Sequence, residues 1–198
     1  MTPEPFFTFV LFVTALYGTP GPATLSIAAS GAAFGFRRTI TYVLGGLMGL
    51  VIIFIMVAFG LMVLFTEYPT VHLVFKWVSL FYIFYLAYKI ATATTIKSDG
   101  PEQLGFLRGI PLALLNPKAY FAIIATVSQF VKQGDGYHES FILVVVWAIS
   151  LTLVFDLAWA YTGSMIGSRL GSRGLSAKVN VLFAILLIAS VVITMFMN

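Results

Sequence analysis

Apolar residues follow one another along this chain in long continuous runs, separated by short polar connections. Residues 39–66, 140–155 and 179–198 carry no charged side chain. A run of about 18 or more apolar residues is long enough to cross a membrane as a helix. Charged and turn-forming residues divide the chain into six such segments, which the pattern predicts at residues 6–34, 40–65, 72–91, 106–131, 141–163 and 179–197.

The composition of the chain agrees with this pattern. Of its 198 residues, 60% are hydrophobic and 9% are charged, whereas charged residues make up about 25% of an ordinary soluble domain. The apolar runs are continuous, so they do not fit the alternating strands of a membrane β-barrel. Cysteine is absent, which excludes disulfides and cysteine-bound metal. The sequence therefore predicts an all-α integral membrane protein with a single membrane domain over residues 1–198.

Positively charged residues lie mostly on one side of the predicted membrane helices. The first, third and fifth connections, with the helix ends beside them, hold Arg37, Arg38, Lys89, Lys97, Arg108, Arg169, Arg173 and Lys178. The opposite side has only Lys76 and Lys132. Because Lys and Arg concentrate on the cytoplasmic side of membrane proteins, both termini are predicted to lie outside the cytoplasm. The net charge is +4, and the cations are scattered between the predicted helices. This distribution indicates that they orient the chain in the membrane and do not bind nucleic acid.

Two of the six segments are interrupted by helix-breaking residues at matching places. The first segment contains Thr-Pro-Gly-Pro at residues 19–22, and the fourth contains Asn-Pro-Lys at residues 116–118. The prolines Pro20 and Pro117 lie 97 positions apart in a chain of 198 residues. Each break therefore falls in the first helix of a three-helix half, and three helices per half place the second half upside down in the membrane.

This arrangement predicts six transmembrane helices in an inverted 3+3 repeat, with halves at about residues 1–98 and 99–198. Proline in a helix interior costs about 3 kcal/mol, and irregular backbone at membrane depth is tolerated only where it is buried or lines a cavity. Paired interruptions in an inverted repeat point to the binding site of a transporter. The alternative is that the prolines only kink packed helices. Two breaks at matching positions of the two halves favour the binding site over this alternative.

The broken helices would offer a positive and a negative pole to a ligand. Half-helices that begin after the breaks point free N–H groups at the cavity, and the preceding half-helices offer carbonyl groups. Such a pair of poles suits a zwitterion such as an amino acid. The predicted substrate-binding residues are Pro20, Gly21, Pro22, Ala23, Asn116, Pro117 and Lys118.

Asp156 is the only acidic residue inside a predicted span. A carboxylate at the bilayer centre costs about 2.5–3.5 kcal/mol on insertion scales, so Asp156 is expected to face the bundle interior. It is the predicted coupling residue, where it would hold a substrate ammonium, exchange a proton or pair with Lys118. The alternatives are a structural hydrogen bond for Asp156 and a side chain that reaches the membrane surface for Lys118.

At this point the motifs resemble those of the LysE/RhtB family of amino-acid exporters. The resemblance rests on TPGP at residues 19–22, GFRR at 35–38, YLAYK at 85–89, LLNPKA at 114–119 and QF at 129–130. It covers essentially the whole chain. It implies export of an amino acid from the cytoplasm across a bacterial inner membrane, and we expect this export to be driven by proton antiport.

Departures from the family pattern narrow the expected substrate. Ala23 stands where many members have Asn, and Ser128 where many have Pro. Relatives that export arginine or lysine carry acids near the glycines of the second span and after the Asn-Pro motif, whereas the sequence around Gly49 and Phe121 is neutral. The resemblance therefore implies the neutral branch, with a substrate similar to threonine, homoserine or leucine.

Three classes of function remain open from the sequence. A proton-coupled exporter needs a titratable carboxylate in the membrane, which Asp156 supplies, and a passive channel or facilitator for small solutes does not. A membrane scaffold has no use for paired helix breaks. Motifs of hydrolases or phosphate-binding loops are absent, and His72 and His138 stand alone near span ends. No enzymatic activity, metal or other cofactor is therefore expected. The helix faces with small residues are expected to pack against other helices of the same chain, and a homodimer through these faces is the minor alternative.

Overall fold

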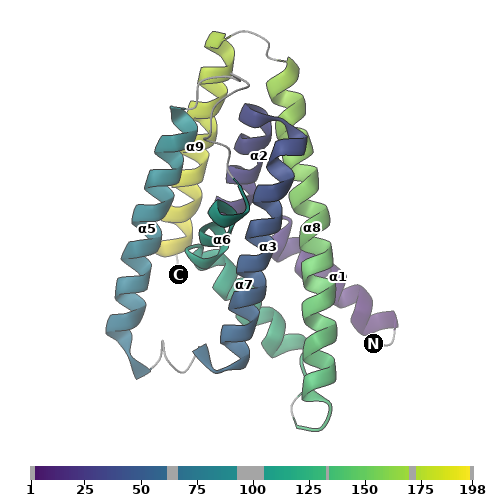
Figure 1. Cartoon of the computed structure of the whole chain (residues 1–198). Helices are drawn as coiled ribbons and strands as arrows, with labels where there is room; N and C mark the ends of the chain where they lie inside the picture. Colours follow the sequence, from purple (N-terminus) through teal and green to yellow (C-terminus); the bar gives the residue numbers. More distant parts are fainter. Residues whose placement is uncertain (1–2, 62–66, 93–104, 133, 170–172, 197–198) are drawn as a thin grey trace.

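The computed structural model describes residues 3–61, 67–92, 105–132, 134–169 and 173–196, and its regular elements are all helices. In chain order these are α1 (Pro3–Tyr17), α2 (Pro22–Phe34), α3 (Phe36–Ala58), α5 (Pro69–Ala91), α6 (Phe106–Leu114), α7 (Pro117–Phe130), α8 (Tyr137–Arg169) and α9 (Arg173–Phe196) (Figure 1). The prediction of an all-α protein is confirmed.

Three helices, α3, α5 and α8, are each long and apolar enough to cross a membrane. The pairs α1 with α2 and α6 with α7 are also apolar, and they bend by 68° and 69° at their breaks. Helix α9 contributes the shorter apolar stretch Val181–Ser190 among the described residues. By length and composition the described helices thus make three spans, or up to five with the bent pairs. The six-span inverted repeat stays a prediction.

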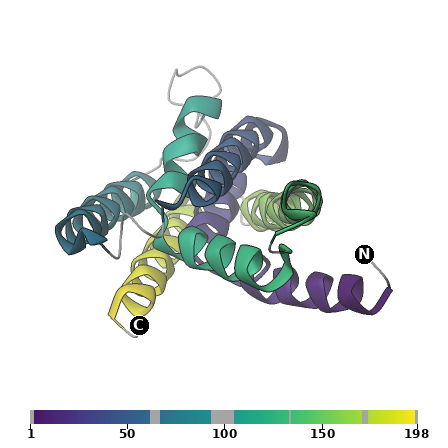
Figure 2. The same cartoon turned by 90° about the horizontal axis from the view of Figure 1, so that it is seen from below.

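Helix α2 lies inside the bundle, where it packs on α8, α3 and α9. A β-carbon placed on Gly31 of α2 or Gly163 of α8 would collide with backbone atoms of the facing helix, and the same holds for Gly45 and Gly109 between α3 and α6. These glycines therefore allow the helix backbones to approach closely within one chain. Viewed from below, α1 and α7 lie across the lower end of the bundle (Figure 2).

The buried core joins the two halves of the sequence. Its largest fully buried side chains include Phe9, Tyr42, Ile123 and Leu187, which come from α1, α3, α7 and α9. The hydroxyl groups of Ser26 and Tyr42 also share a buried hydrogen bond of 2.8 Å between α2 and α3. The broken helices are therefore fixed by packing on both sides of each break.

Two helices end elsewhere than the apolar pattern predicted. Helix α3 stops at Ala58 instead of near residue 65, because Gly60 takes a positive φ of 86° just after the helix, a conformation that ends helices. Helix α8 has 33 residues, Tyr137–Arg169, and at about 50 Å it is longer than the hydrocarbon core. Its last turns carry Ser164 and Ser168, whose hydroxyls donate to backbone carbonyls one turn back, so the helix continues beyond its apolar part.

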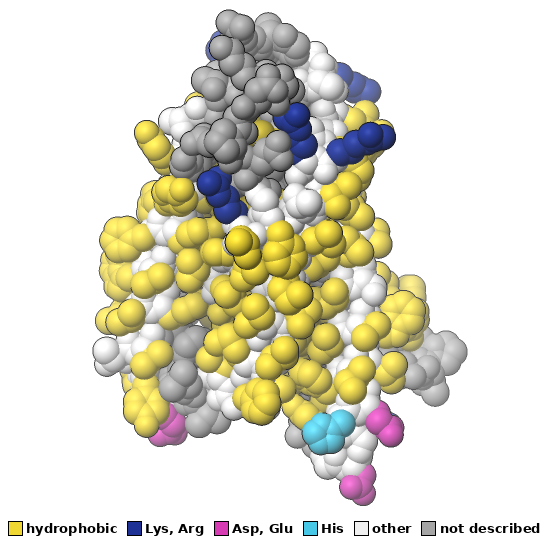
Figure 3. Space-filling view, viewed as in Figure 1, with side chains coloured by type: hydrophobic (Ala, Val, Ile, Leu, Met, Phe, Trp, Pro, Cys, Tyr) yellow, Lys and Arg dark blue, Asp and Glu magenta, His cyan; other side chains and the backbone are white. Residues whose placement is uncertain are grey.

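On one face of the molecule, the visible basic and acidic side chains lie at opposite ends. Figure 3 shows Lys and Arg at one end and Asp, Glu and His at the other. The end with the cations contains the junction of α2 with α3 and the end of α8 (Figure 1), where Arg37, Arg38 and Arg169 are exposed. Lys97, one of the predicted cytoplasmic cations, lies outside the described residues. The start of α1 and the end of α9 lie in the lower half of Figure 1, and the orientation in a membrane stays a prediction.

Candidate functional site

The two predicted breaks separate pairs of half-helices in the structure. Pro22 is the first residue of α2, and Pro117 is the first residue of α7. Proline is well suited to that position, because the N–H it lacks would have no partner within the helix. The prolines therefore start new half-helices, and the sharp bends at the breaks distinguish them from simple kinks.

A side chain near each proline hydrogen-bonds the backbone at the start of the half-helix. The N–H of Gly21 donates to Oγ1 of Thr24 at 2.8 Å, and the Thr24 hydroxyl returns a hydrogen bond to the Gly21 carbonyl at 3.1 Å. At the other break, Oδ1 of Asn116 accepts a hydrogen bond from the N–H of Lys118 at 3.2 Å. Both breaks are thus stable local structures, built from caps of different kinds.

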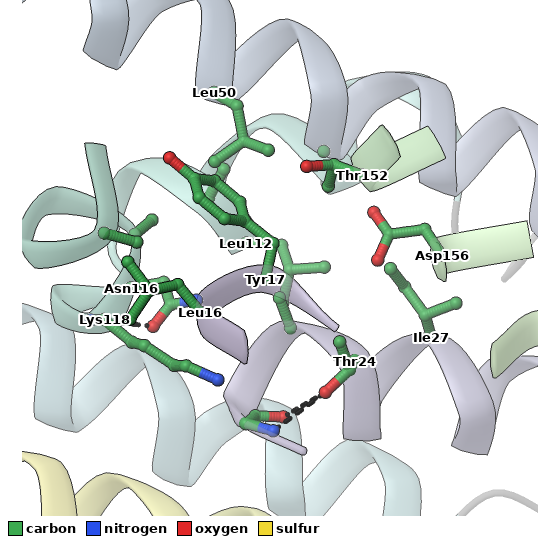
Figure 4. A pocket seen from close by; sticks show the side chains of 16 residues that line it. Leu16, Tyr17, Thr24, Ile27, Leu50, Leu112, Asn116, Lys118, Thr152 and Asp156 are labelled. Atoms are coloured by element: carbon green, nitrogen blue, oxygen red, sulfur yellow. Dashed lines mark hydrogen bonds between the residues drawn. The ribbon is translucent and has the colours of Figure 1, made fainter. Parts of the chain in front are cut away.

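A cavity of about 60 Å³ lies between the two breaks and the helices α3 and α8 (Figure 4). Such a volume holds only a few water molecules. Five of the predicted site residues line it: Gly21, Ala23, Asn116, Lys118 and Asp156. The predicted prolines Pro20, Pro22 and Pro117 are not among its lining residues. The structure therefore brings the two breaks and the predicted coupling residue together around one space, and their roles stay predictions.

Lys118 connects the second break to the first. Its half-buried side chain donates two hydrogen bonds from Nζ, at 3.0 Å to the carbonyl of Thr19 and at 2.9 Å to the Thr19 hydroxyl. The side chain passes close to Gly21, where a β-carbon would lie 3.0 Å from Cδ and 3.1 Å from Nζ of Lys118. Glycine at position 21 therefore leaves room for the Lys118 side chain.

Asp156 faces the cavity from the side opposite Lys118 (Figure 4). It is 5% exposed, and no hydrogen bond or ion pair joins its carboxylate to another residue within the described ranges. Lys118 is bonded to Thr19, so the predicted option of a pair between Lys118 and Asp156 is not what the structure shows. The cavity thus has a basic group on one side and a carboxyl group on the other.

Several polar residues at the site were not predicted from the sequence. Thr152 lines the cavity one turn before Asp156, and the spacing of four residues on a helix was a signal that could have found it. Tyr17 also lines the cavity, and its hydroxyl shares a hydrogen bond of 3.2 Å with Thr126 of α7. The indole N–H of Trp159 donates to the carbonyl of Gly18 at 3.2 Å. No sequence signal marks these last two contacts, because each joins distant segments.

The site contains one basic and one acidic side chain, Lys118 and Asp156, but no metal centre in the part of the chain that is described. No group of three or more His, Asp or Glu side chains there could hold a metal ion. The useful chemistry of the cavity is non-covalent binding, by one ammonium group, one carboxyl group and the hydroxyls of Tyr17, Thr24 and Thr152.

Comparisons with known proteins agree with this description. The family model "LysE type translocator" matches residues 14–195. The "Cysteine/O-acetylserine efflux protein" of Escherichia coli O139:H28 (strain E24377A / ETEC) is 30% identical over 196 residues, which cover 95% of this chain and 96% of that protein. The proteins of the same name from Escherichia coli K12 and Salmonella choleraesuis SC-B67 are 29% identical, with the same coverage. No solved structure matches the chain.

The match extends over nearly the whole chain and includes both helix breaks and Asp156. It confirms the resemblance inferred from the sequence motifs, and with it the prediction of a transporter instead of an enzyme. The apolar helices and the family match together identify a multi-pass membrane protein. The chain belongs to the LysE family of translocators.

Proposed function

We propose that this protein is a secondary transporter that exports small, neutral amino acids or their derivatives from the cytoplasm in exchange for protons. The observation that carries the proposal is the cavity between the two helix breaks, with Lys118 and Asp156 on its opposite sides. A passive channel does not need a buried carboxyl group, so Asp156 favours a carrier.

The names of the relatives support a small, neutral substrate. They are described as efflux proteins for cysteine and O-acetylserine, which are both zwitterions with short side chains that carry no charge at neutral pH. The remaining cavity lining agrees, because it includes the apolar residues Leu16, Ile27, Leu50 and Leu112 and no further charged residue. Threonine, homoserine and leucine belong to the same chemical class and stay candidates.

The binding mode follows from the charges in the cavity. The substrate carboxylate would bind the Lys118 ammonium, which then exchanges its hydrogen bonds to Thr19 for bonds to the substrate. The positive end of the α7 helix dipole would support the same negative charge. The substrate ammonium would bind Asp156, whose carboxylate has no partner among the described residues.

Asp156 is also the group that would couple substrate and proton movement. When the substrate ammonium leaves toward the outside, the buried carboxylate loses its partner, and an unpaired buried charge is unfavourable. Binding of a proton from the outside removes that charge and allows the empty site to return to the cytoplasmic side. Release of this proton into the cytoplasm then restores the carboxylate for the next substrate.

Transport in sealed everted membrane vesicles with an acidic lumen tests this cycle. The wild-type protein should accumulate a labelled neutral amino acid in the lumen, because the lumen corresponds to the outside of the cell. Asp156→Asn keeps the size of the side chain but cannot titrate, so it should abolish accumulation. Exchange between two filled compartments should continue with a higher KM, because the amide oxygen still accepts a hydrogen bond from the substrate ammonium but carries no charge. Asp135→Asn makes the same change at an exposed position outside the cavity and is the matched control.

The outcomes separate the candidate functions. Full accumulation by Asp156→Asn would show that the residue is structural and that coupling lies elsewhere. Downhill movement in the wild type, without stimulation by the pH gradient and without exchange, would support the passive channel instead.

A further inference from the structure

Three glycines lie close together on α3, at positions 45, 46 and 49, and they face different surroundings. A β-carbon on Gly45 would collide with the backbone carbonyl of Phe106 in α6. A β-carbon on Gly49 would lie 2.6 Å from the carbonyl oxygen of Ile110 and 2.7 Å from Cβ of Ala113. Close packing of α3 on α6 therefore requires glycine at both positions.

Gly46 is buried, yet packing does not require its lack of a side chain. The nearest atom to a β-carbon placed there is the carbonyl oxygen of Gly109, at 3.9 Å, which is an ordinary contact distance. Glycine within a helix is less favourable than alanine, because its backbone loses more freedom on folding. An alanine would therefore fit here and would favour the helix, so the packing of α3 gives no reason for the glycine.

The surroundings of Gly46 supply another reason. Gly46 lines the central cavity, together with Leu50, one turn further along α3, and with Leu112 and Ala113 of α6. The missing side chain of Gly46 therefore enlarges an apolar part of the cavity. In a cavity of only about 60 Å³, one added methyl group takes a large share of the space.

We propose that Gly46 sets the upper size limit of the substrate side chain. This inference rests on the proposed transport of neutral amino acids and deepens it. Lys118 and Asp156 would hold the charged ends of the substrate, so its side chain must occupy a part of the cavity without charge. The apolar part beside Gly46, Leu50 and Leu112 fits that requirement, and Gly46 is the lining residue there that can gain a methyl group without disturbing α6.

The test measures transport against side-chain length. Uptake into everted vesicles with an acidic lumen is measured for alanine, serine, threonine, leucine and O-acetylserine, and the longest side chain that is still transported efficiently defines a cut-off. Gly46→Ala should move this cut-off to shorter side chains, with about a tenfold or larger loss of kcat/KM for the longest accepted substrate relative to alanine. Gly46→Val should move it further.

Two controls separate a size limit from general damage. Gly105→Ala adds the same methyl group where no atom lies within 4 Å, outside the cavity, and should leave the cut-off unchanged. The melting temperature of purified Gly46→Ala should equal or exceed that of the wild type, since alanine favours the helix. A lower melting temperature with an equal loss for every substrate would mean that Gly46 is needed for packing, which would overturn the inference.

The remaining outcomes are also distinct. If the wild type transports several of these amino acids and Gly46→Ala keeps the same cut-off, the size limit is set elsewhere and only this inference fails. If the wild type transports none of them, the proposed function fails, and this inference fails with it.

Discussion

Lys118 is the residue through which the two helix breaks contact each other directly. The sequence predicted its place in the site from the Asn-Pro-Lys motif, but not its partner Thr19, which lies 99 positions away. A long side chain at a break can reach several groups, and spacing along the chain does not say which. Only the packing of the half-helices selects the Thr19 carbonyl and hydroxyl.

The contact between Lys118 and Gly21 leads to a prediction at the residue scale. Gly21→Ala would place a methyl group about where the Lys118 side chain passes, and displacing the ammonium would weaken binding of the substrate carboxylate. We expect KM for a neutral amino acid to rise about tenfold, the effect of losing one hydrogen bond to a charged group. The backbone itself should tolerate the change, because the φ of Gly21, −163°, lies in the extended region.

Initial rates of vesicle uptake over a range of substrate concentrations would measure this effect. Gly105→Ala again serves as the control, since the same methyl group meets no atom there. An unchanged KM for Gly21→Ala would argue against Lys118 as the group that binds the carboxylate.

The different roles of the α3 glycines could not be predicted from the sequence. Gly45, Gly46 and Gly49 form one glycine-rich stretch, and the motif gives no means of separating them. In the structure, two of them permit contact with α6 and the third lines the cavity. Their difference depends on which face of α3 meets α6, and that depends on the path of the whole fourth segment.

At the scale of the elements, the two broken helices are the part of the fold that the sequence predicted best. Proline and glycine disrupt a helix locally, so the breaks could be predicted from the residues themselves, at 18–22 and 116–118. In the structure the non-helical residues are 18–21 and 115–116, within two residues of these bounds. Helix ends were harder to place. The apolar pattern missed the end of α3 at Ala58 and made α8 too short, because a helix can stop before its apolar residues do or continue beyond them.

The prolines at the breaks give a prediction at the same scale. Pro22→Ala and Pro117→Ala each restore an N–H at the first residue of a half-helix. The helix can then extend backward through the break, and the backbone groups there become hydrogen-bonded within the helix. We expect each variant to lose most of its export while remaining in the membrane. Efflux from loaded cells, with the amount of membrane-inserted protein measured in parallel, checks this result.

Pro69→Ala is the matched control for these variants. Pro69 also begins a helix, α5. The residues on either side of Pro22 and Pro117 line the cavity, whereas those on either side of Pro69 do not, so its replacement should have little effect on export. Normal export by both Pro22→Ala and Pro117→Ala would mean that the prolines serve only as helix starts.

At the scale of the whole molecule, the separation of charges between the two ends predicts the orientation of the chain. Reporter fusions after Gly100 and Gly174 should report the cytoplasm, and fusions after Gly136 and Asn198 should report the opposite side, because Lys and Arg are retained on the cytoplasmic side. Gly100 and Asn198 lie outside the described residues. A cytoplasmic C-terminus would contradict an even number of spans, and with it the inverted repeat.

The bond between Lys118 and Thr19 has a consequence for how the whole transporter would turn over. Some carriers only swap one substrate molecule for another, because an unloaded site leaves a buried charge without a partner and cannot change sides. Here the ammonium group has two oxygen partners within the protein itself. For the proposed cycle, the unloaded form would therefore need only a proton on Asp156 to reset, and the cell would lose substrate in net amounts without importing any in return.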